Sequence, residues 1–212
     1  MGRENKNEAI ASLHREQIMQ AAKKLFVDKG FTHTSINDLS KASNYSRRTI
    51  YAYFESKEDI LHHILEKGLM TLKQDIEKAI ENNDDFICTY RTIFVSMNHY
   101  QIKYHYASDI IDRADSKDIE NVSDTFKHIL LLGNEINTLL SNLIQKGQEK
   151  GIVRKEIEPT LTVYIMWSSI SSFLSLVQMK GPYITQQFSI SDSDLLEYGF
   201  KQIMNSILVK SL

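Results

Sequence analysis

The sequence predicts an all-α protein of about nine helices, in which an amino-terminal three-helix domain precedes a larger carboxy-terminal helical bundle. Three observations lead to this fold class. The 212 residues include only two prolines and eight glycines, which favours long helices over many short strands. Apolar residues recur at intervals of three and four along most of the chain. Hydroxyl and acidic residues stand where several of these periodic segments begin, as helix caps do.

Composition places the chain among globular proteins, with 42% hydrophobic and 25% charged residues. The single cysteine, Cys88, excludes an intrachain disulfide framework and fits a reducing cytoplasm. The first residues contain no apolar run typical of a signal peptide, so we expect a cytoplasmic protein. The net charge is −2, but residues 1–60 hold ten Lys and Arg against eight Asp and Glu, whereas the remainder holds 15 against 19. This imbalance predicts a local basic surface on an acidic body.

The first helix is predicted over residues 14–29, and Gly30 is placed to end it in a left-handed conformation. Its apolar stripe consists of Ile18, Ala21, Ala22, Leu25 and Phe26. Thr34 or Ser35 then caps a second helix, which runs to about Ala42.

A third, short helix has the most informative composition. Ser46 is suited to cap it, Arg47 and Arg48 follow at once, and Ile50 and Phe54 lie four residues apart on an apolar face. Cations at the start of a helix are unfavourable for that helix, because they meet the positive end of its dipole. Two arginines there therefore indicate an external partner that carries phosphates and base edges. Two short helices joined by a tight turn, the second of them basic, describe a helix-turn-helix.

Three regions are expected from this pattern: a polar, disordered arm at 1–13, a helix-turn-helix DNA-binding domain at 14–60, and a larger helical domain at 61–212. The later helices are predicted at about 56–80, 85–99, 101–112, 122–150, 160–180 and 191–209. Gly151 and the Gly181-Pro182 pair are placed to end two of them.

The segment from Thr160 to Met179 contains 20 uncharged residues, and its length alone would admit a membrane span. Eight of these residues are Ser, Thr or Gln, which is too polar for a typical span. Ser168, Ser172 and Ser175 form a stripe of small residues that would let another helix approach closely. We interpret the segment as a buried bundle helix at a subunit interface, with no membrane involved.

Residues 15–65 resemble the amino-terminal domain of the TetR family of bacterial transcriptional regulators. The matching positions are Ile18, Ala21, Ala22, Leu25, Phe26, Gly30, Phe31, Thr34, Ser35, Ile36, Leu39, Ser40, Ala42, Tyr45, Ser46, Thr49, Ile50, Tyr51, Ala52, Tyr53, Phe54, Ser56, Lys57, Glu58, Ile60 and Leu61. Residues 146–153 and 156–159 are more weakly similar to the family. Asn44 stands where the family usually has Gly, and Asn tolerates positive φ nearly as well. The pair Arg47-Arg48 stands where small residues are frequent, so we expect an operator particular to this protein.

The resemblance implies a homodimer that binds double-stranded DNA at a palindromic operator and is released from it by a small effector. The predicted DNA-binding residues are Thr34, Ser35, Ser46, Arg47, Arg48, Thr49, Tyr51, Tyr53 and Lys57. The two arginines can each form paired hydrogen bonds with guanine, and Thr49 could contact a thymine methyl group or a phosphate. Tyr53 either contacts the DNA backbone or only packs the domain together, and Ser46 is better explained as a helix cap than as a base contact.

The resemblance implies that residues 61–212 are an effector-binding and dimerisation domain, in which the last two long helices pair with their copies in a four-helix interface. The candidate interface residues are Trp167, Ser168, Ser172, Ser175, Tyr198, Ile203 and Ile207. An effector pocket would be lined by Tyr90, Phe94, Met97, Tyr100, Tyr104, Phe126, Trp167 and Phe173, although aromatic residues at helical spacing are more often plain core. Such a pocket would suit a planar or cationic lipophile. The alternative is a TetR-like regulator that has no small effector and responds to a protein partner.

Catalysis has little support in the sequence. No spacing resembles a known zinc site, and there is neither a Gly-rich phosphate loop nor a serine elbow. We therefore predict no cofactor, no metal and no enzymatic activity. An enzyme or a membrane-associated helical bundle is a third hypothesis, and it would show no salt-dependent binding to duplex DNA.

Overall fold

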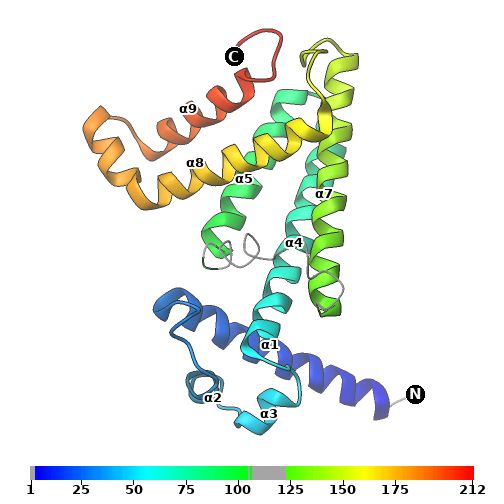
Figure 1. Ribbon diagram of the computed structural model, residues 1–212, viewed down its shortest axis with the longest axis vertical. Helices are drawn as coiled ribbons and strands as arrows, with labels where there is room; N and C mark the ends of the chain where they lie inside the picture. Colours follow the sequence, from blue (N-terminus) through cyan, green and yellow to red (C-terminus); the bar gives the residue numbers. More distant parts are fainter. Residues whose placement is uncertain (1–2, 105, 107–122) are drawn as a thin grey trace. The chain divides into compact units, whose positions relative to one another are not determined.

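The computed structural model describes residues 3–104, 106 and 123–212. These residues form eight α-helices and no β-strand, which confirms the predicted all-α fold (Figure 1). They divide into two compact units. Unit 1 contains residues 3–68, 106 and 123–130, and unit 2 contains residues 69–104 and 131–212.

Unit 1 contains α1 (Arg3–Lys29), α2 (Ile36–Ser43) and α3 (Arg47–Tyr51), with the first turns of α4 (Lys57–Asn82) and α7 (Asp124–Glu149). Helix α1 packs against α2, which in turn packs against α3. At most 2% of each core side chain is exposed in Ile18, Ala22, Phe26, Leu39, Ile50, Phe54, Ile60, Leu61 and Ile64. The apolar stripes predicted for these helices are therefore the faces that they bury.

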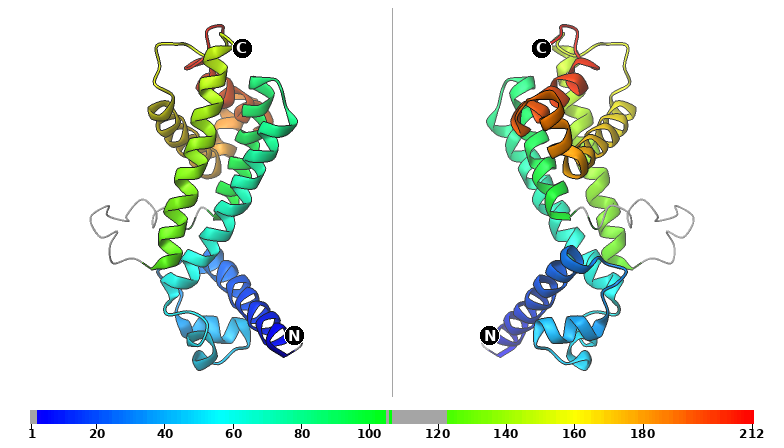
Figure 2. Two further views of the ribbon diagram at one scale, coloured as in Figure 1. Left: turned by 90° about the vertical axis from the view of Figure 1, so that its right-hand side faces the viewer. Right: turned by 90° about the vertical axis from the view of Figure 1, so that its left-hand side faces the viewer.

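Helix α1 begins earlier than its apolar periodicity suggests. We expected an arm at residues 1–13 and a helix from about His14, but the helix starts at Arg3, and Figure 2 shows it as one continuous rod. Its first turns include Glu, Lys and Ala, which are good helix formers. Ile10 and Leu13 are exposed there. Periodicity indicates burial rather than helicity, so a helical segment with no core to face gives no periodic signal.

Local capping explains the two short helices. Ser35, not Thr34, caps α2: its Oγ accepts a hydrogen bond from the Asp38 N–H (3.2 Å), and the Asp38 carboxylate accepts one from the Ser35 N–H (2.9 Å). Asn44 ends α2 in the left-handed conformation, with φ of 59°. Ser46 caps α3 by accepting a hydrogen bond from the Thr49 N–H at 3.0 Å. The predicted turn, with Asn in place of Gly, is confirmed.

Unit 2 contains α5 (Phe86–Tyr104), α8 (Pro159–Phe188) and α9 (Asp192–Asn205), with the remaining turns of α4 and α7. Helix α8 packs on both α5 and α9 (Figure 1). The ring of Phe173 on α8 lies so close to Gly199 on α9 that a β-carbon at Gly199 would come within 2.1 Å of it.

Three helix boundaries in unit 2 differ from the prediction. Helix α9, expected to run to about residue 209, ends at Asn205. Residues 101–104, expected to begin a separate helix at 101–112, continue α5, and the rest of that segment except residue 106 lies outside the described residues. Helix α8 was expected to end at Gly181-Pro182, but it continues to Phe188 with Pro182 inside it, and Figure 1 shows the helix changing direction towards its orange end. A proline removes one helical N–H and crowds the preceding turn, so it can bend a helix without ending it.

The prediction that α8 is a buried helix is wrong for the single chain. Five of its residues are buried, namely Val163, Met166, Ile170, Leu174 and Gly181. On its other faces Leu161, Tyr164, Ile165, Met179, Tyr183 and Phe188 are exposed. By length and composition α8 could cross a membrane, with a mean hydropathy of 1.4, and 22% of that apolar window is buried in the structure. Helix α8 therefore carries apolar residues on exposed faces as well as on the face that it buries.

Candidate nucleic-acid interface

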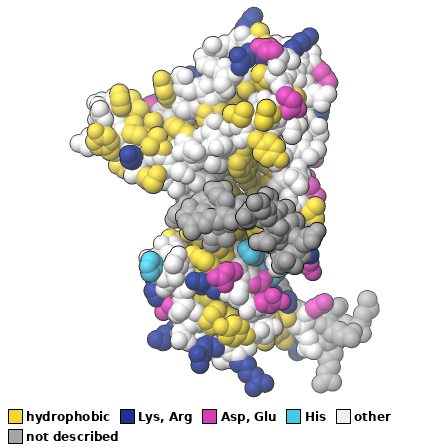
Figure 3. Space-filling model, in the orientation of Figure 1, with side chains coloured by type: hydrophobic (Ala, Val, Ile, Leu, Met, Phe, Trp, Pro, Cys, Tyr) yellow, Lys and Arg dark blue, Asp and Glu magenta, His cyan; other side chains and the backbone are white. Residues whose placement is uncertain are grey.

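The first turn of α3 presents two cations to solvent. Arg47 and Arg48 are both exposed, and neither forms an ion pair with any described residue. Tyr51, at the end of the helix, is 55% exposed, and Thr49 is half-buried. Figure 3 shows Lys and Arg side chains gathered on the surface of unit 1 over α2 and α3. The predicted local basic surface is therefore present in unit 1.

The exposed arginines stand on a firmly held helix. Ile50, on the opposite side of α3, is completely buried. The Ser40 hydroxyl on α2 donates a hydrogen bond to the Tyr45 carbonyl at 2.7 Å, immediately before the Ser46 cap. Anchoring of the turn and of the apolar face fixes where α3 points, so Arg47 and Arg48 project from a defined surface.

Two residues predicted to contact DNA have internal partners instead. The Thr34 side chain is 3% exposed, and its hydroxyl donates to the Gly30 carbonyl at 2.8 Å. The Lys57 ammonium donates to the carbonyls of Phe31 (2.8 Å) and Thr34 (2.9 Å), and lies 4.2 Å from the centroid of the Phe31 ring. Thr34 is therefore not available at the surface, and Lys57 joins the loop before α2 to the start of α4. The partners of Lys57 are 26 and 23 positions away in sequence, so no local pattern indicates its role, whereas Thr34 bonds to Gly30 only four positions away.

Tyr53 is held by α1. Its phenol oxygen lies 2.9 Å from Nδ1 of His14, and the His14 ring packs against both Tyr45 and Tyr53, with centroids 5.0 and 5.7 Å away. The Tyr45 hydroxyl donates to Oε1 of Gln17 at 2.5 Å. His14 was absent from the predicted site. A usable signal was present, since His14 and Gln17 are polar residues three apart on the helix whose apolar stripe begins at Ile18.

The aromatic residues predicted to line an effector pocket do not form one group. Tyr90, Phe94, Met97 and Tyr104 are buried along α5 in unit 2, where burial raises the pKa of Tyr90. Tyr100 stacks on Tyr104, with centroids 4.9 Å apart, and Phe173 lies near Phe94, at 6.4 Å. Phe126, in contrast, belongs to unit 1, where its ring centroid lies 5.1 Å from that of His62 and burial lowers the pKa of His62. Phe126 therefore does not belong with the α5 residues.

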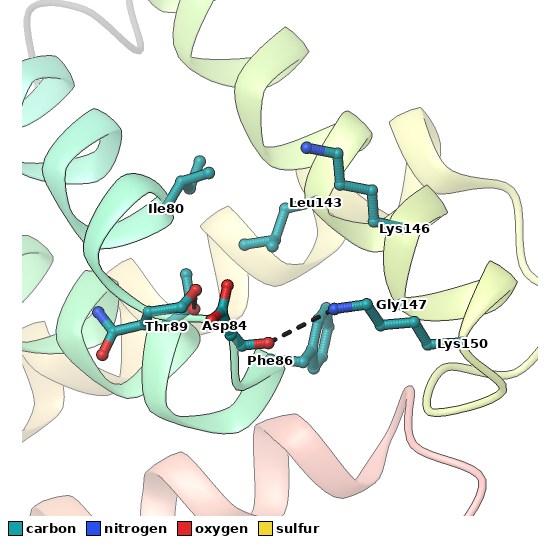
Figure 4. Close-up of a pocket in the computed structure, with 9 residues that line it drawn as sticks. Ile80, Asp84, Phe86, Thr89, Leu143, Lys146, Gly147 and Lys150 are labelled. Atoms are coloured by element: carbon teal, nitrogen blue, oxygen red, sulfur yellow. Dashed lines mark hydrogen bonds between the residues drawn. The ribbon is translucent and has the colours of Figure 1, made fainter.

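Two pockets can be described in unit 2, and neither is lined mainly by the predicted residues. The first, of about 130 Å³, lies where α4 ends, α5 begins and α7 ends. Figure 4 shows its lining: Ile80, Asn83, Asp84, Phe86, Thr89, Leu143, Lys146, Gly147 and Lys150. The second, of about 170 Å³, lies between α5 and α9 and includes Phe94, the one predicted residue in either lining. There Arg91 forms an ion pair with Glu197, and its guanidinium carbon lies 4.4 Å from the centroid of the Phe200 ring.

The predicted interface residues on α8 and α9 are mostly at the surface. Ser168, Ser172 and Tyr198 are exposed, whereas Trp167 and Ile203 are half-buried. Ser175 accepts a hydrogen bond from the Gln101 amide at 3.0 Å. Ile207 is 3% exposed, because it follows α9 in a segment that pairs with residues 152–154, where the Arg154 N–H donates to the Ile207 carbonyl at 3.0 Å. Ile207 therefore belongs to the core of unit 2.

A helix-turn-helix with unpaired arginines at the start of its second helix defines a DNA-binding domain. The family model described as bacterial regulatory proteins, tetR family, matches residues 18–64. Over these residues this chain is similar to the DNA-binding domain of that family.

Curated relatives share this sequence similarity, and solved structures show a similar fold. The uncharacterized HTH-type transcriptional regulator YfiR of Bacillus subtilis is 36% identical over 66 residues, which are 31% of this chain and 32% of YfiR. The HTH-type transcriptional repressor NicS of Pseudomonas putida is 26% identical over 159 residues, 75% of this chain and 74% of NicS. The fatty acid degradation regulator FadR of Bacillus halodurans has a similar fold, with a TM-score of 0.73 at 16% identity over 94% of this chain and 97% of FadR.

The family model covers residues 18–64, and several of the curated relatives match only about a third of this chain. In the curated relatives with the strongest local matches, this chain spans about a third of their length, from 29% to 35%. These relatives are regulators and not enzymes. In the described parts of the chain, no group of three or more His, Cys, Asp or Glu side chains is placed to hold a metal ion.

Proposed function

We propose that this chain is a cytoplasmic, dimeric transcriptional repressor that binds a palindromic DNA operator and is released by a small, largely apolar or aromatic effector. The observation that carries the proposal is the pair of exposed arginines at the start of α3. Arg47 and Arg48 stand on a rigid recognition helix, and the described residues offer them no carboxylate. Guanidinium groups that no protein group neutralises suit the phosphates and guanine edges of the major groove.

The residues of unit 1 divide into two kinds of contact. Arg47 and Arg48 would read bases, because a guanidinium can donate two hydrogen bonds to O6 and N7 of guanine. Tyr51 and Tyr53 would contact the phosphate backbone, which positions the domain without reading sequence. Lys57 would contribute through its charge near the backbone, while its hydrogen bonds hold the loop at 31–34.

Dimerisation is supported by the exposed apolar face of α8. Leu161, Tyr164 and Ile165 share this face with the small residues Ser168 and Ser172. Figure 3 shows hydrophobic side chains gathered on the surface of this part of unit 2. Exposed apolar patches of this kind mark interaction surfaces, and a palindromic operator requires two recognition helices related by a twofold axis.

Release by an effector is supported by the aromatic core of unit 2. Phe94 and Phe200 pack at 5.5 Å beside the pocket between α5 and α9. An effector acts only through a difference in its affinity for two states of the protein. The alternative is that a protein partner, docking on the exposed surface of unit 2, controls the same DNA-binding domain.

The test begins with selection of duplexes from a random-sequence library, followed by anisotropy titrations over a salt series. Enrichment of a palindrome, and affinity that falls steeply with salt, would support the proposal. Failure to enrich any sequence would refute it. A screen of apolar and polar compounds for shifts in melting temperature, followed by a DNA-release assay, separates the two hypotheses: release by an apolar compound favours the effector, and release only by a lysate protein favours the partner.

A further inference from the structure

The pocket between α5 and α9 lies between two matched helix faces. Four residues of each helix line it, and both sets follow the spacing of three, one and three positions that places side chains on one face. Helix α8 packs on both α5 and α9 and so holds the two faces in place. The volume of the pocket is about 170 Å³, and an apolar cavity of about 150 Å³ is large enough to bind benzene. The pocket therefore has room for a compound with one ring.

The apolar walls of the pocket are largely aromatic. The side chains of Phe94 and Phe200 are both buried, and their ring centroids lie 5.5 Å apart with an angle of 65° between the planes. Val95 and Leu196 add aliphatic side chains from the two helices, and Val95 is 46% exposed. A planar ring that entered the pocket would remove these apolar groups from water and contact the two phenylalanine rings.

Arg91 gives the pocket a cation with spare hydrogen-bond donors. Its guanidinium carbon lies 4.4 Å from the centroid of the Phe200 ring, and its Nη1 donates to Oε2 of Glu197. A guanidinium has five N–H groups, and the Arg91 side chain has no other hydrogen bond to the described residues. Glu197 has a second cationic partner, because Nζ of Lys201 lies 3.6 Å from its Oε1. Arg91 can therefore bind a further carboxylate while Glu197 remains paired.

Two uncharged polar groups complete the lining. The Asn98 amide and the Ser193 hydroxyl have no hydrogen-bond partner among the described side chains and carbonyls. Each can donate to or accept from a polar substituent on a ring. Asp192 and Asp194 flank Ser193 in the first turn of α9 and disfavour an anion beside it. The position for an anionic group is therefore at Arg91.

We infer that the pocket between α5 and α9 binds a small carboxylate with a single aromatic ring. The carboxylate accepts paired hydrogen bonds from the planar guanidinium of Arg91, and the ring lies against Phe94 and Phe200. The inference names the chemical class of the effector, and it rests on the proposed function for its regulatory role. Binding to the pocket does not require DNA, so it is measured on the free protein.

The experiment is isothermal titration calorimetry of the full chain with benzoate and phenylacetate. At least one of these acids should bind saturably with one site per chain. Benzamide has the ring without the charge, and acetate has the charge without the ring. Both should bind about ten-fold more weakly than the better acid, the size of a hydrogen bond to a charged group or of a lost apolar contact.

Three variants locate the binding site. Arg91→Gln keeps amide donors but removes the cation, so it should weaken binding of the acid about ten-fold. Val95→Glu places a carboxylate at an exposed position of the lining and should abolish binding. Lys180→Gln removes an exposed cation of α8 outside the lining, and as the matched control it should bind as wild type does.

The outcomes distinguish the ligand site from the proposed function. Absence of saturable binding by both acids, equal affinity for benzoate and benzamide, or wild-type affinity in both pocket variants overturns the inference. If Arg91→Gln does not fold, as judged by its melting temperature, Val95→Glu decides, because a wild-type affinity there contradicts the assigned site. A chain that binds an acid in this pocket but no duplex refutes the proposed function alone, and a chain that binds a duplex but neither acid refutes the inference alone.

Discussion

The Lys57 ammonium donates a hydrogen bond to the Thr34 carbonyl at 2.9 Å across 23 positions of sequence. Lys57→Ala removes this bond and the one to Phe31, so two backbone carbonyls lose a charged donor. We expect the free energy of unfolding to fall by about 1–3 kcal/mol, together with a similar weakening of binding to all duplexes. Lys29→Ala, which breaks an exposed ion pair with Asp38, should cost at most about 1 kcal/mol. Urea denaturation of both variants tests this, and equal stabilities would contradict it.

Arg47→Ala and Arg48→Ala should reduce sequence discrimination and leave folding unchanged. Both side chains are exposed and have no ion-pair partner among the described residues. A lost pair of guanine contacts should cost about 1–3 kcal/mol of discrimination between the selected operator and a scrambled duplex. Lys41→Ala removes the third cation of the segment from Lys41 to Phe54. It should instead weaken binding to both duplexes and reduce the salt dependence of that binding. Unchanged discrimination in both arginine variants would exclude α3 as the recognition helix.

Gly199→Ala should destabilise the contact between α8 and α9. The new β-carbon would stand 2.1 Å from the Phe173 ring, which packs directly on the glycine backbone. Overpacking of this kind costs about 1–3 kcal/mol. Gly133→Ala is the matched control, since a β-carbon there meets nothing within 4 Å and an alanine inside α7 should stabilise it slightly. The melting temperature should therefore fall in Gly199→Ala and rise slightly in Gly133→Ala. An unchanged melting temperature in Gly199→Ala would mean that α8 and α9 separate easily.

The capping box of α2 should make folding sensitive to acid. Hydrogen bonds from the Lys29 ammonium, and then from the Ser35 side chain and backbone, hold the pKa of Asp38 well below its usual 3.8. The unfolded chain therefore binds a proton at Asp38 more readily than the folded chain does. The ionised carboxylate stabilises the fold above about pH 4, and this stabilisation is lost as the pH falls. Asp38→Asn should have a lower melting temperature than wild type at neutral pH. This difference in melting temperature should close as the pH falls below 4. A gap that stayed constant down to pH 2 would disprove the assignment.

A charge on the exposed face of α8 should prevent dimerisation. Ile165 is 60% exposed in the single chain, and Ile165→Glu would place a carboxylate in the proposed interface. We expect the dimer to dissociate in sedimentation experiments, because a buried unpaired charge is costly. Val27→Glu, at a similarly exposed apolar position on α1, should remain dimeric. If both variants behave alike, the α8 face is not the subunit contact.

Local sequence patterns predicted the elements whose chemistry is local. The stripe from Ile18 to Phe26, the capping residue Ser46 and the left-handed Asn44 all depend on neighbours within a few positions. Each is therefore readable from spacing alone.

Distant partners account for the differences. Lys57 carries an ammonium group that suits phosphate, and only the fold shows that the carbonyls of Phe31 and Thr34 occupy it. Phe126 has the aromatic spacing of a pocket residue, yet it packs in unit 1. Pro182 has the character of a helix terminator, but α8 continues past it. Local rules set what a residue can do, and its tertiary neighbours decide which of these options is used.

Trp167, half-buried on α8, is the only tryptophan in the chain. Its indole therefore supplies almost all of the fluorescence excited at the red edge of the absorption band. Since it lies on the helix whose apolar face is exposed, removal of water from that face would shift its emission to shorter wavelength. Assembly of this protein can therefore be followed by the intrinsic fluorescence of Trp167, without a label and at any concentration that a fluorimeter can detect.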